Sequence, residues 1–194
     1  MTKISLLLIQ IFKFLAITVI IVGYTQAGWA EAGHVKWGET SRHNQYEHKT
    51  ILQFYFHDNI TGDALTAVKI AEPEDASPGV TGFGKLFMAD EPLTIHPDPA
   101  SKLVGRAQGM WGRSSMTDRT LFMSFTYVFF QGIYNGSSVS ILGRNLVTQP
   151  IREMPVVGGT GLFRMARGYA LAQTYFINTT SLNAVVGYNL TIFH

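Results

Sequence analysis

Four polar residues stand within or at the ends of otherwise apolar segments, and they are the residues best suited to chemistry in this chain. Asp58 follows the segment FYFH, Asn145 follows ILGR, and Arg152 precedes a glycine-rich stretch. Thr174 closes a run in which small and large residues alternate. A carboxyl group can exchange a proton with a ligand, and a guanidinium group can stabilise a developing negative charge. These residue types are suited to a site that binds a ligand and moves a proton on it.

Each of these residues also has a purely structural interpretation. Asp58 could cap the turn that follows it by accepting hydrogen bonds from the amides of Ile60 or Thr61. Arg152 could pair with Glu153 or with a carboxylate of a loop. From the pattern alone the structural roles are slightly favoured, so both interpretations stay open at this point.

Several other kinds of catalytic or binding motif are missing from the sequence. The chain has no cysteine, and no serine lies in a nucleophile elbow. Residues 79–86 resemble a phosphate-binding loop, but Leu86 stands where a hydroxyl must ligate Mg²⁺. His43, His48 and His57 lack the spacing of a helical metal site and are expected to be solvated histidines of a loop. We therefore expect no metal ion and no cofactor.

The first 30 residues have the pattern of a secretory signal. Lys3 precedes an apolar run at residues 4–23, and the small residues Ala27 and Ala30 follow it. The run is long enough to span a bilayer, but Lys13 near its middle and the small residues after it favour cleavage. We therefore predict a secreted protein that begins after Ala27 or Ala30, with no membrane anchor once the signal is removed.

The predicted mature chain is close to neutral, because removing Lys3 and Lys13 leaves 13 basic residues against 13 acidic ones. No cluster of Lys or Arg indicates contact with a phosphate backbone, so nucleic acid is not expected as a partner. A chain of about 165 residues without cysteine can be stabilised by one hydrophobic core. Sequons predict glycosylation at Asn59, Asn135 and Asn178, whereas the sequon at Asn189 lies in an apolar segment and is the least suitable.

Eight mainly β segments follow a polar, flexible arm at residues 31–50. We expect them at residues 51–57, 64–71, 82–89, 102–112, 121–130, 138–142, 162–176 and 183–193. Short turns separate them, except for a Pro-rich connection at residues 90–99 that should not join a strand ladder. This order predicts an antiparallel barrel or a sandwich, and the hairpin spacing favours a barrel domain at residues 51–194. A barrel of eight strands can hold one small ligand.

Residues 152–176 carry the most distinctive pattern of the chain. Pro155 and the closely spaced glycines after it predict a backbone that either turns tightly or leaves room for a neighbouring group. The alternation that follows places only small residues on one face of a strand: Ala166, Gly168, Ala170, Ala172 and Thr174. Bulky neighbours could pack against such a face, but the polar Thr174 at its end favours the wall of a cavity.

Four motifs within these segments resemble the plant dirigent proteins. They are FYFHDNITGDALTAVKIA, LVGRAQG, YNGSSVSILGRN and REMPVVGGTGLFRMARGYALAQT, in this order. The resemblance implies an eight-stranded antiparallel β-barrel of the allene-oxide-cyclase-like type, a homotrimer, and a glycoprotein secreted to the apoplast. Dirigent proteins direct the stereochemistry of coupling between two phenoxy radicals that a separate oxidase or laccase has generated. Pterocarpan synthases of the same family instead act as enzymes and close an ether ring on a quinone methide with loss of water.

The resemblance also assigns residues to a pocket. Asp58 and Arg152 match its acidic and basic residues, and Thr174 matches its hydroxyl. Asn145 stands where lignan-forming members have a second aspartate, and Trp111 stands where they usually have a tyrosine. A neutral amide cannot act as an acid, and an indole cannot donate through a phenol. The resemblance therefore argues against pinoresinol formation and predicts that one carboxylate, Asp58, carries the pH dependence.

Three functions follow from the sequence. The first is a stereochemical guide for coupling of monolignol or related phenolic radicals in lignan and phenylpropanoid biosynthesis, and it is favoured because it is the commoner assignment in the family. The second is a dehydrating lyase that cyclises an isoflavanol through a quinone methide. The third is a carrier that binds hydrophobic ligands without converting them. The expected partners are phenolic radicals or quinone methides and, for the guide, an external oxidase.

Overall fold

The computed structural model describes residues 47–74 and 81–194 of the chain. The predicted signal at residues 1–30 and most of the predicted arm lie outside the described residues. The first strand begins at Lys49, two residues before the predicted start of the barrel. In the part of the chain that the structure describes, no helix is long and apolar enough to cross a membrane.

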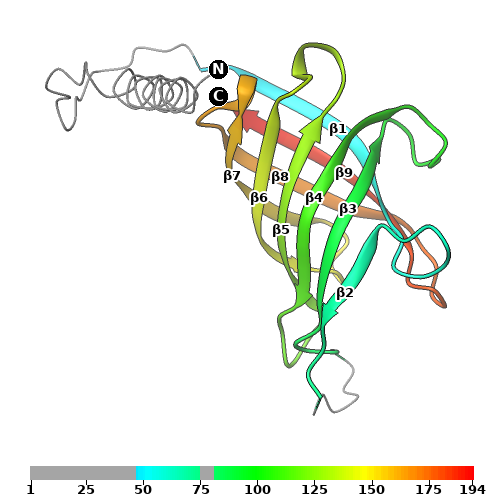
Figure 1. The fold of residues 1–194 in the computed structure, drawn as a ribbon. Helices are drawn as coiled ribbons and strands as arrows, with labels where there is room; N and C mark the ends of the chain where they lie inside the picture. Colours follow the sequence, from blue (N-terminus) through cyan, green and yellow to red (C-terminus); the bar gives the residue numbers. More distant parts are fainter. Residues whose placement is uncertain (1–46, 75–80) are drawn as a thin grey trace, which may run out of the picture. The chain divides into compact units, whose positions relative to one another are not determined.

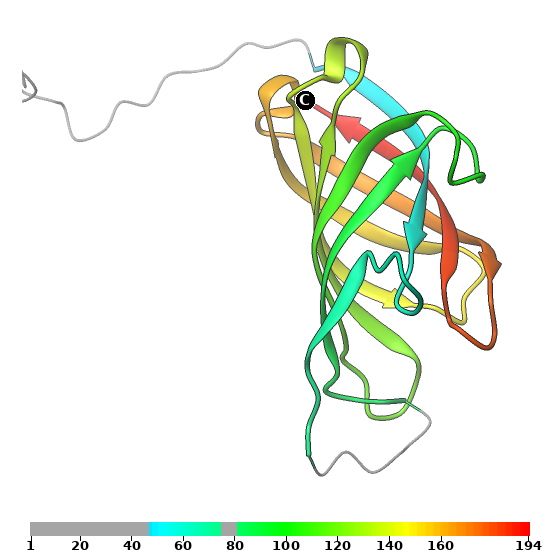
Figure 2. The same cartoon turned by 45° about the vertical axis from the view of Figure 1, so that its right-hand side comes forward.

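Nine antiparallel strands form one sheet in the described residues, and eight of them close into a barrel (Figures 1 and 2). The strands are β1 (Lys49–Asp58), β2 (Ala67–Ala71), β3 (Leu86–Thr94), β4 (Leu103–Arg113), β5 (Thr120–Phe129), β6 (Ser138–Leu146), β7 (Arg152–Thr160), β8 (Arg167–Ile177) and β9 (Ala184–Phe193). From β2 to β9 each strand pairs with the next along the chain, and β1 pairs with both β9 and β3. The short β2 pairs with β3 alone and extends the sheet beside the ring. The predicted eight-stranded antiparallel barrel is confirmed.

Two segments differ from the sequence prediction because their proline and glycine residues lie within strands and not in turns. Residues 152–160 form β7, which pairs with β8 from Arg152 to Val156, and the tight turn is the short helix η2 (Gly161–Phe163) that follows. The strand predicted at residues 82–89 instead runs from Leu86 to Thr94 and includes Pro92. Pro92 is tolerated because it lies between the residues of β3 that pair with β2 and those that pair with β1, where its missing N–H is not needed.

One end of the barrel is filled by large buried side chains. They are Phe54, Tyr127, Phe129, Val139, Phe163, Leu190 and Ile192. Phe163 comes from η2 and stacks on Tyr134 of a second short helix, η1 (Gly132–Tyr134), with ring centroids 5.7 Å apart. The edge of Phe163 also meets Phe129 at 5.8 Å. The two short helices thus close this end of the barrel with aromatic rings.

The small-residue face of β8 packs into this core. Ala166, Ala170 and Ala172 are all buried and belong to the hydrophobic cluster. Gly168 has φ 147°, and a Cβ atom there would collide with the carbonyl oxygen of Thr191 on β9. The prediction that this face walls a cavity is wrong for Ala166, Gly168 and Ala170, which make room for neighbouring strands and bulky side chains. Thr174 at the end of the face does line a cavity.

Candidate functional site

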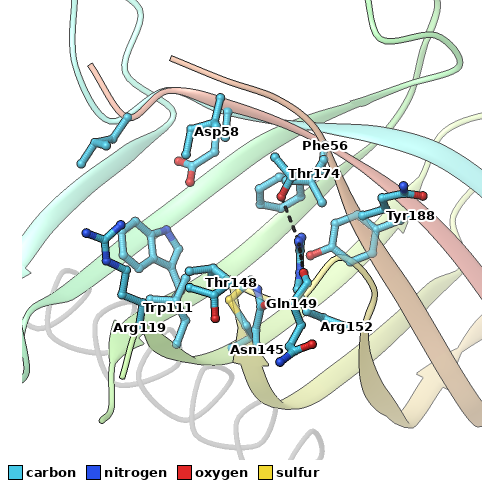
Figure 3. Close-up of a pocket in the computed structure, with 18 of the residues that line it drawn as sticks. Phe56, Asp58, Trp111, Arg119, Asn145, Thr148, Gln149, Arg152, Thr174 and Tyr188 are labelled. Atoms are coloured by element: carbon cyan, nitrogen blue, oxygen red, sulfur yellow. Dashed lines mark hydrogen bonds between the residues drawn. The ribbon is translucent and has the colours of Figure 1, made fainter. Parts of the chain in front are cut away.

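The other end of the barrel holds a cavity of about 520 Å³. Its wall is largely apolar, with Phe56, Ile60, Trp111, Leu121, Met123, Val147, Ile177, Ala184 and Val186. Side chains from β1, β4, β5, β6, β7, β8 and β9 contribute to it, so the barrel itself fixes their positions (Figure 3). Pockets for small organic ligands have volumes of about 300–1,000 Å³, and this cavity falls within that range.

The five residues that the family resemblance assigns to a pocket all line this one cavity. They are Asp58, Trp111, Asn145, Arg152 and Thr174, and they come from β1, β4, β6, β7 and β8 (Figure 3). The end of each strand brings its residue to the same end of the barrel, although the residues are far apart in the sequence. The contacts and the charge of each side chain determine what it can do in the cavity.

Arg152 is bonded to Thr174 and not to Glu153. One terminal nitrogen, Nη1, donates to Thr174 Oγ1 at 2.9 Å and to the carbonyl oxygen of Gln149 at 3.4 Å. Among the described residues Arg152 has no ion pair, and its Nε atom has no hydrogen-bond partner. Burial lowers the pKa of Arg152 below its usual value. The guanidinium group is therefore held in place by neutral oxygens, and its charge can act on a ligand.

Asp58 does not cap the turn after β1. Asn183 does so, because its Oδ1 accepts from the amides of Ile60 at 3.0 Å and Thr61 at 3.2 Å. Oδ1 of Asp58 is buried and has no hydrogen-bond partner within the described residues. Burial raises the pKa of Asp58 to about 6, and interaction with the carboxyl group of Glu91 offsets part of that rise. The carboxyl group is thus free of a structural role in the turn and is poised to titrate near neutral pH.

Glu91 on β3 is a second acidic group that the sequence analysis missed. Its side chain is 0% exposed. Burial and the negative charge of Asp58 together raise the pKa of Glu91 to about 9. The prediction that Asp58 alone carries the pH dependence did not consider this second carboxyl group, which does not itself line the cavity. Ala89, Glu91 and Leu93 alternate as inward residues of β3, but the prolines at positions 92, 97 and 99 hide this alternation in the sequence.

Two aromatic residues define the cavity wall around these charged groups. Trp111 stacks on Phe87 with ring centroids 4.0 Å apart, and its Nε1 is buried without a partner in the described part of the chain. Tyr188 of β9 also lines the cavity, and burial raises its pKa to about 12. Tyr188 was not predicted, since it lies inside an apolar strand and looks like an ordinary core residue. Oδ1 of Asn145 is also buried and unpartnered in the described residues, so a ligand with hydroxyl groups would satisfy several open positions.

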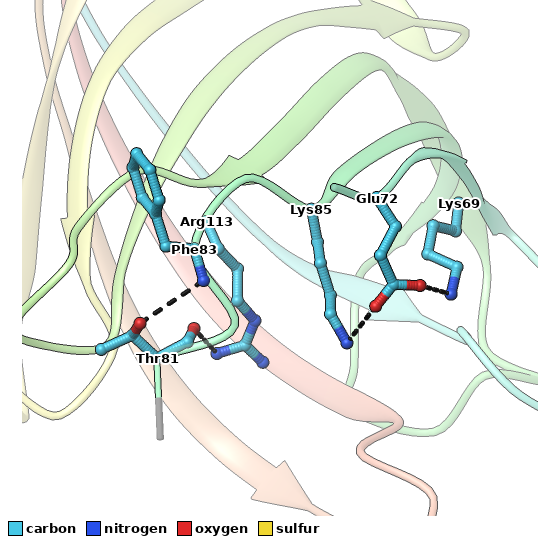
Figure 4. Close-up of polar contacts among 6 residues, drawn as sticks. All are labelled: Lys69, Glu72, Thr81, Phe83, Lys85 and Arg113. Carbon is cyan, nitrogen blue, oxygen red and sulfur yellow. Dashed lines mark hydrogen bonds and ion pairs between the residues drawn. The ribbon is translucent and has the colours of Figure 1, made fainter. Parts of the chain in front are cut away.

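Two arginines stand at the edge of the same cavity. Arg113 ends β4, and Arg119 precedes β5. Burial and the neighbouring charge of Arg119 lower the pKa of Arg113. Arg113 donates to the carbonyl oxygen of Thr81 at 3.2 Å (Figure 4). This pair was not predicted, because a polar turn separates the two residues in the sequence.

The prediction for the histidines is wrong for His57. This residue lies in β1, is 3% exposed, and places Nε2 2.7 Å from Oγ1 of Thr94. Burial lowers the pKa of His57. Because side chains alternate along a strand, His57 faces away from the side that carries Phe56 and Asp58. His48 is exposed beside His194, and His43 lies outside the described residues.

The predicted glycosylation sites differ in how they are exposed. Asn135 and Asn178 are exposed in turns, after η1 and after β8 respectively. Asn59 is half-buried at the end of β1, where its backbone N–H donates to Thr66 Oγ1 at 2.8 Å. Modification at these positions stays a prediction.

Comparison with known proteins agrees with the barrel fold. The family model for dirigent-like proteins matches residues 49–193. The chain therefore belongs to the dirigent family. Dirigent protein 23 of Arabidopsis thaliana is 51% identical over 145 residues, which cover 75% of this chain and 78% of that protein.

Proteins named as pterocarpan synthases are also similar to this chain. Pterocarpan synthase 1 of Glycyrrhiza echinata is 45% identical over 151 residues, covering 77% of this chain and 80% of that protein. The solved structure of a pterocarpan synthase dirigent protein superposes with a TM-score of 0.76 at 42% identity. That superposition covers 81% of this chain and 99% of the other.

Proposed function

We propose that this dirigent protein is a dehydrating lyase that closes an ether ring on a phenolic alcohol through a quinone methide. The observation that carries the proposal is the buried carboxyl group of Asp58, which lines the cavity and has no structural role in the adjacent turn. The sequence alone favoured a stereochemical guide. A guide needs no proton donor, whereas dehydration does, and the position of Asp58 supports the lyase.

The ring closure can be written with residues that line the cavity. Asp58 donates a proton to the leaving hydroxyl group of an isoflavanol, the C–O bond breaks, and water departs. The conjugated phenol releases its proton to solvent and becomes the neutral quinone methide. A phenolate forms on this oxygen when the methide carbon is attacked in the next step, then takes a proton back from solvent, and Arg152 stabilises that phenolate. A second phenolic oxygen then attacks the methide carbon, its proton returns to Asp58, and the first phenolate regains a proton. The net change is the loss of one water molecule.

The rest of the cavity suits an uncharged phenolic ligand. Apolar side chains make up most of the wall, and Trp111 and Tyr188 offer aromatic surfaces. The unpartnered Nε1 of Trp111 and Oδ1 of Asn145 can bind hydroxyl groups and orient the rings. Holding the two reacting ends of the ligand in the right orientation lowers the activation barrier of the ring closure.

The second candidate is a guide for coupling of phenoxy radicals such as those of monolignols. Trp111, Asn145 and Tyr188 supply orienting contacts without any proton transfer, and the similarity to Arabidopsis dirigent proteins supports this function. An external oxidase or laccase would have to deliver the radicals. In that case the protein would alter the ratio of enantiomers and leave the total amount of product unchanged.

Two parallel incubations separate these functions. The purified protein is given a racemic isoflavanol with no oxidase and, separately, coniferyl alcohol with a laccase, and products are resolved by chiral chromatography. We expect ring-closed product from the isoflavanol, lost in Asp58→Asn and retained in Asp63→Asn, an exposed aspartate of the β1–β2 loop. A changed enantiomeric ratio in the laccase incubation alone would replace the lyase by the guide. Binding without either effect would leave a carrier.

Secretion and assembly belong to the same proposal. The signal-like residues 1–30 and the exposed sequons at Asn135 and Asn178 support a secreted glycoprotein of the apoplast. The family resemblance supports a trimer. N-terminal sequencing of secreted material should begin after Ala27 or Ala30, and light scattering should give three times the mass of one chain. Intact Met1 in a membrane fraction would contradict the cleavage.

A further inference from the structure

We propose that Glu91 is the proton partner of Asp58: the two buried carboxyl groups share one proton, and Glu91 keeps Asp58 able to act as an acid. Glu91 is not among the residues that line the cavity, so it is a positioning residue that acts through Asp58. The role of Asp58 as the acid rests on the proposed function. The existence of the pair does not.

The barrel closes at the point where the two residues meet. β3 pairs with β2 as far as Ala89 and with β1 from Leu93, so Glu91 lies where β3 changes partners. Extending the register of Phe56 with Leu93 by two residues brings Asp58 opposite Glu91. Since side chains alternate along strands, both carboxyl groups lie on the inward face. Directly opposed side chains in an antiparallel pair have Cβ atoms about 5 Å apart.

Neither carboxyl group is neutralised by its surroundings. Both oxygens of Glu91 and Oδ1 of Asp58 are buried without a hydrogen-bond partner of ordinary geometry in the described residues. Two adjacent buried negative charges are strongly unfavourable. One proton placed between the groups turns one oxygen into a donor and leaves the other as its acceptor. This arrangement satisfies both groups with a single negative charge.

The other titratable and charged groups around the pair do not replace that proton. They are Arg106 on β4, Tyr127 on β5, Arg152 on β7 and Tyr188 on β9. Arg106 donates from Nε to Oδ1 of Asp90 at 2.5 Å, so its charge is already paired. Arg152 is held by Thr174 and Gln149. Burial raises the pKa of both tyrosines, which therefore stay neutral.

The pair gives the site a wider working range than one aspartic acid would have. Burial raises the pKa of Asp58 to about 6, and burial together with the charge of Asp58 raises the pKa of Glu91 to about 9. Between these values the pair holds one proton. Without Glu91 the site has one carboxyl group fewer to hold that proton, so its acid form is lost at a lower pH.

The pH dependence of ring closure tests this role. For the wild type we expect the rate to fall only as the pH approaches about 9, the pKa of Glu91. In Glu91→Gln only one carboxyl group remains, so we expect the fall to begin at a lower pH than in the wild type and to reach about a hundredfold two units above its midpoint. At pH 5 the two proteins should differ by only a few-fold. Glu91→Asp, which restores a carboxyl group, should move the alkaline limb back toward the wild type.

A matched control is Glu72→Gln. Glu72 is an exposed glutamate that pairs with Lys69 and Lys85 near the end of β2 (Figure 4), and its carboxyl group does not line the cavity. We expect this variant to keep the wild-type profile. If Glu91→Gln, shown to be folded by circular dichroism, also keeps that profile, the proposal is overturned.

A second measurement needs no substrate. Infrared difference spectra of the free protein should show a protonated carboxyl group at a pH between the values of about 6 and about 9. The band should be absent in Glu91→Gln and present in Glu72→Gln. If the band is absent in the wild type, the proposal of a shared proton is wrong, even if the protein converts the isoflavanol. If the band is present but the isoflavanol is not converted, the carboxyl pair is supported and the proposed lyase function is wrong.

The pH dependence of stability also tests whether Glu91 holds a proton in the folded protein. The folded pKa of Glu91 is raised from 4.5 to about 9, so its contribution to stability is complete below pH 4.5 and is lost as the pH rises toward 9. The free energy of unfolding of the wild type relative to Glu91→Gln should therefore decrease over this interval in urea titrations. A constant difference would show that Glu91 does not hold a proton in the folded state.

Discussion

The two ends of the barrel are built from the same strands and yet have opposite character. At the closed end, aromatic rings from β1, β5 and η2 fill the interior. At the open end the interior is a cavity in which polar atoms of Asp58, Trp111, Asn145 and Arg152 are buried without partners. Buried polar groups without partners cost stability, so the closed end must stabilise a fold that the open end weakens.

Strand β1 shows how this change is made along a single element. Its successive inward residues are Phe54 in the core, Phe56 in the apolar wall of the cavity, and Asp58, the carboxyl group of the cavity. Strand β8 makes the same change from Ala170, which is fully buried, to Thr174, which faces the cavity. The backbone geometry continues unchanged, and only the size and polarity of the side chains differ. Substitutions at the two ends should therefore have different consequences.

The largest effect is expected at the open end, for Asp58→Asn. Removing the acid should lower kcat for ring closure by roughly a hundred- to ten-thousand-fold, the usual worth of general acid catalysis. Stability at neutral pH should not fall, because the variant removes a buried charge whose pKa is raised to about 6. Single-turnover kinetics and urea denaturation measure the two quantities. Equal losses of activity and stability would mean that Asp58 is a structural residue after all.

The opposite result is expected at the closed end, for Phe163→Ala. This ring is 0% exposed and contacts Phe129, Tyr134 and His194. Truncating a buried phenylalanine costs about 3–5 kcal/mol of unfolding free energy. Its neighbour Leu162 is 43% exposed, and Leu162→Ala should change stability by about 0.5 kcal/mol or less.

Activity is the quantity that distinguishes the two ends in this experiment. At temperatures where Phe163→Ala is still folded, its kcat should match that of the wild type, because the ring lies at the end away from the cavity. A loss of kcat in the folded variant would show that the two ends are coupled through the barrel.

The sequence predicted the barrel because its signals are local. Alternation of apolar residues and turns of glycine, proline and asparagine mark most strands without reference to the rest of the chain. β7 and the end of β3 escaped prediction because Pro155 and Pro92 occupy positions where ladder hydrogen bonds are missing on one side. Whether a proline meets such a gap depends on the pairing of distant strands, and no local pattern contains that information.

The site was predictable in part for the same reason. Asp58, Arg152 and Thr174 stood out as polar residues at the ends of apolar strands, and the family resemblance supported them. Glu91 did not stand out, because its importance depends on the register between β1 and β3. The packing of Ala170 could not be foreseen either, since a row of small residues serves a cavity and a crowded core equally well.

Substituting two alanines on neighbouring strands by phenylalanine should have smaller effects, on stability at one position and on ligand binding at the other. Ala170 on β8 is 0% exposed in the core, so Ala170→Phe should destabilise the protein by about 1–3 kcal/mol through overpacking. Ala184 on β9 lines the cavity, so Ala184→Phe should weaken ligand binding and leave stability within about 1 kcal/mol. Urea denaturation and calorimetric titration with a phenolic ligand measure these changes. If Ala170→Phe folds normally and loses binding, the cavity extends further along β8 than the structure shows.

The smallest effect is expected for Thr174→Val, which keeps the shape of the side chain and removes its hydroxyl group. Oγ1 of Thr174 accepts from Nη1 of Arg152 at 2.9 Å, whereas the carbonyl oxygen of Gln149 remains as a longer contact at 3.4 Å. Loss of one such bond is worth about 1 kcal/mol, or roughly a fivefold change in rate. Because Arg152 acts on the phenolate in the transition state, the loss should appear in kcat more than in KM. Thr174→Ser keeps an acceptor and should retain the wild-type rate within about twofold, whereas an equal loss in both variants would mean that the methyl group of Thr174, and not its hydroxyl, positions the guanidinium.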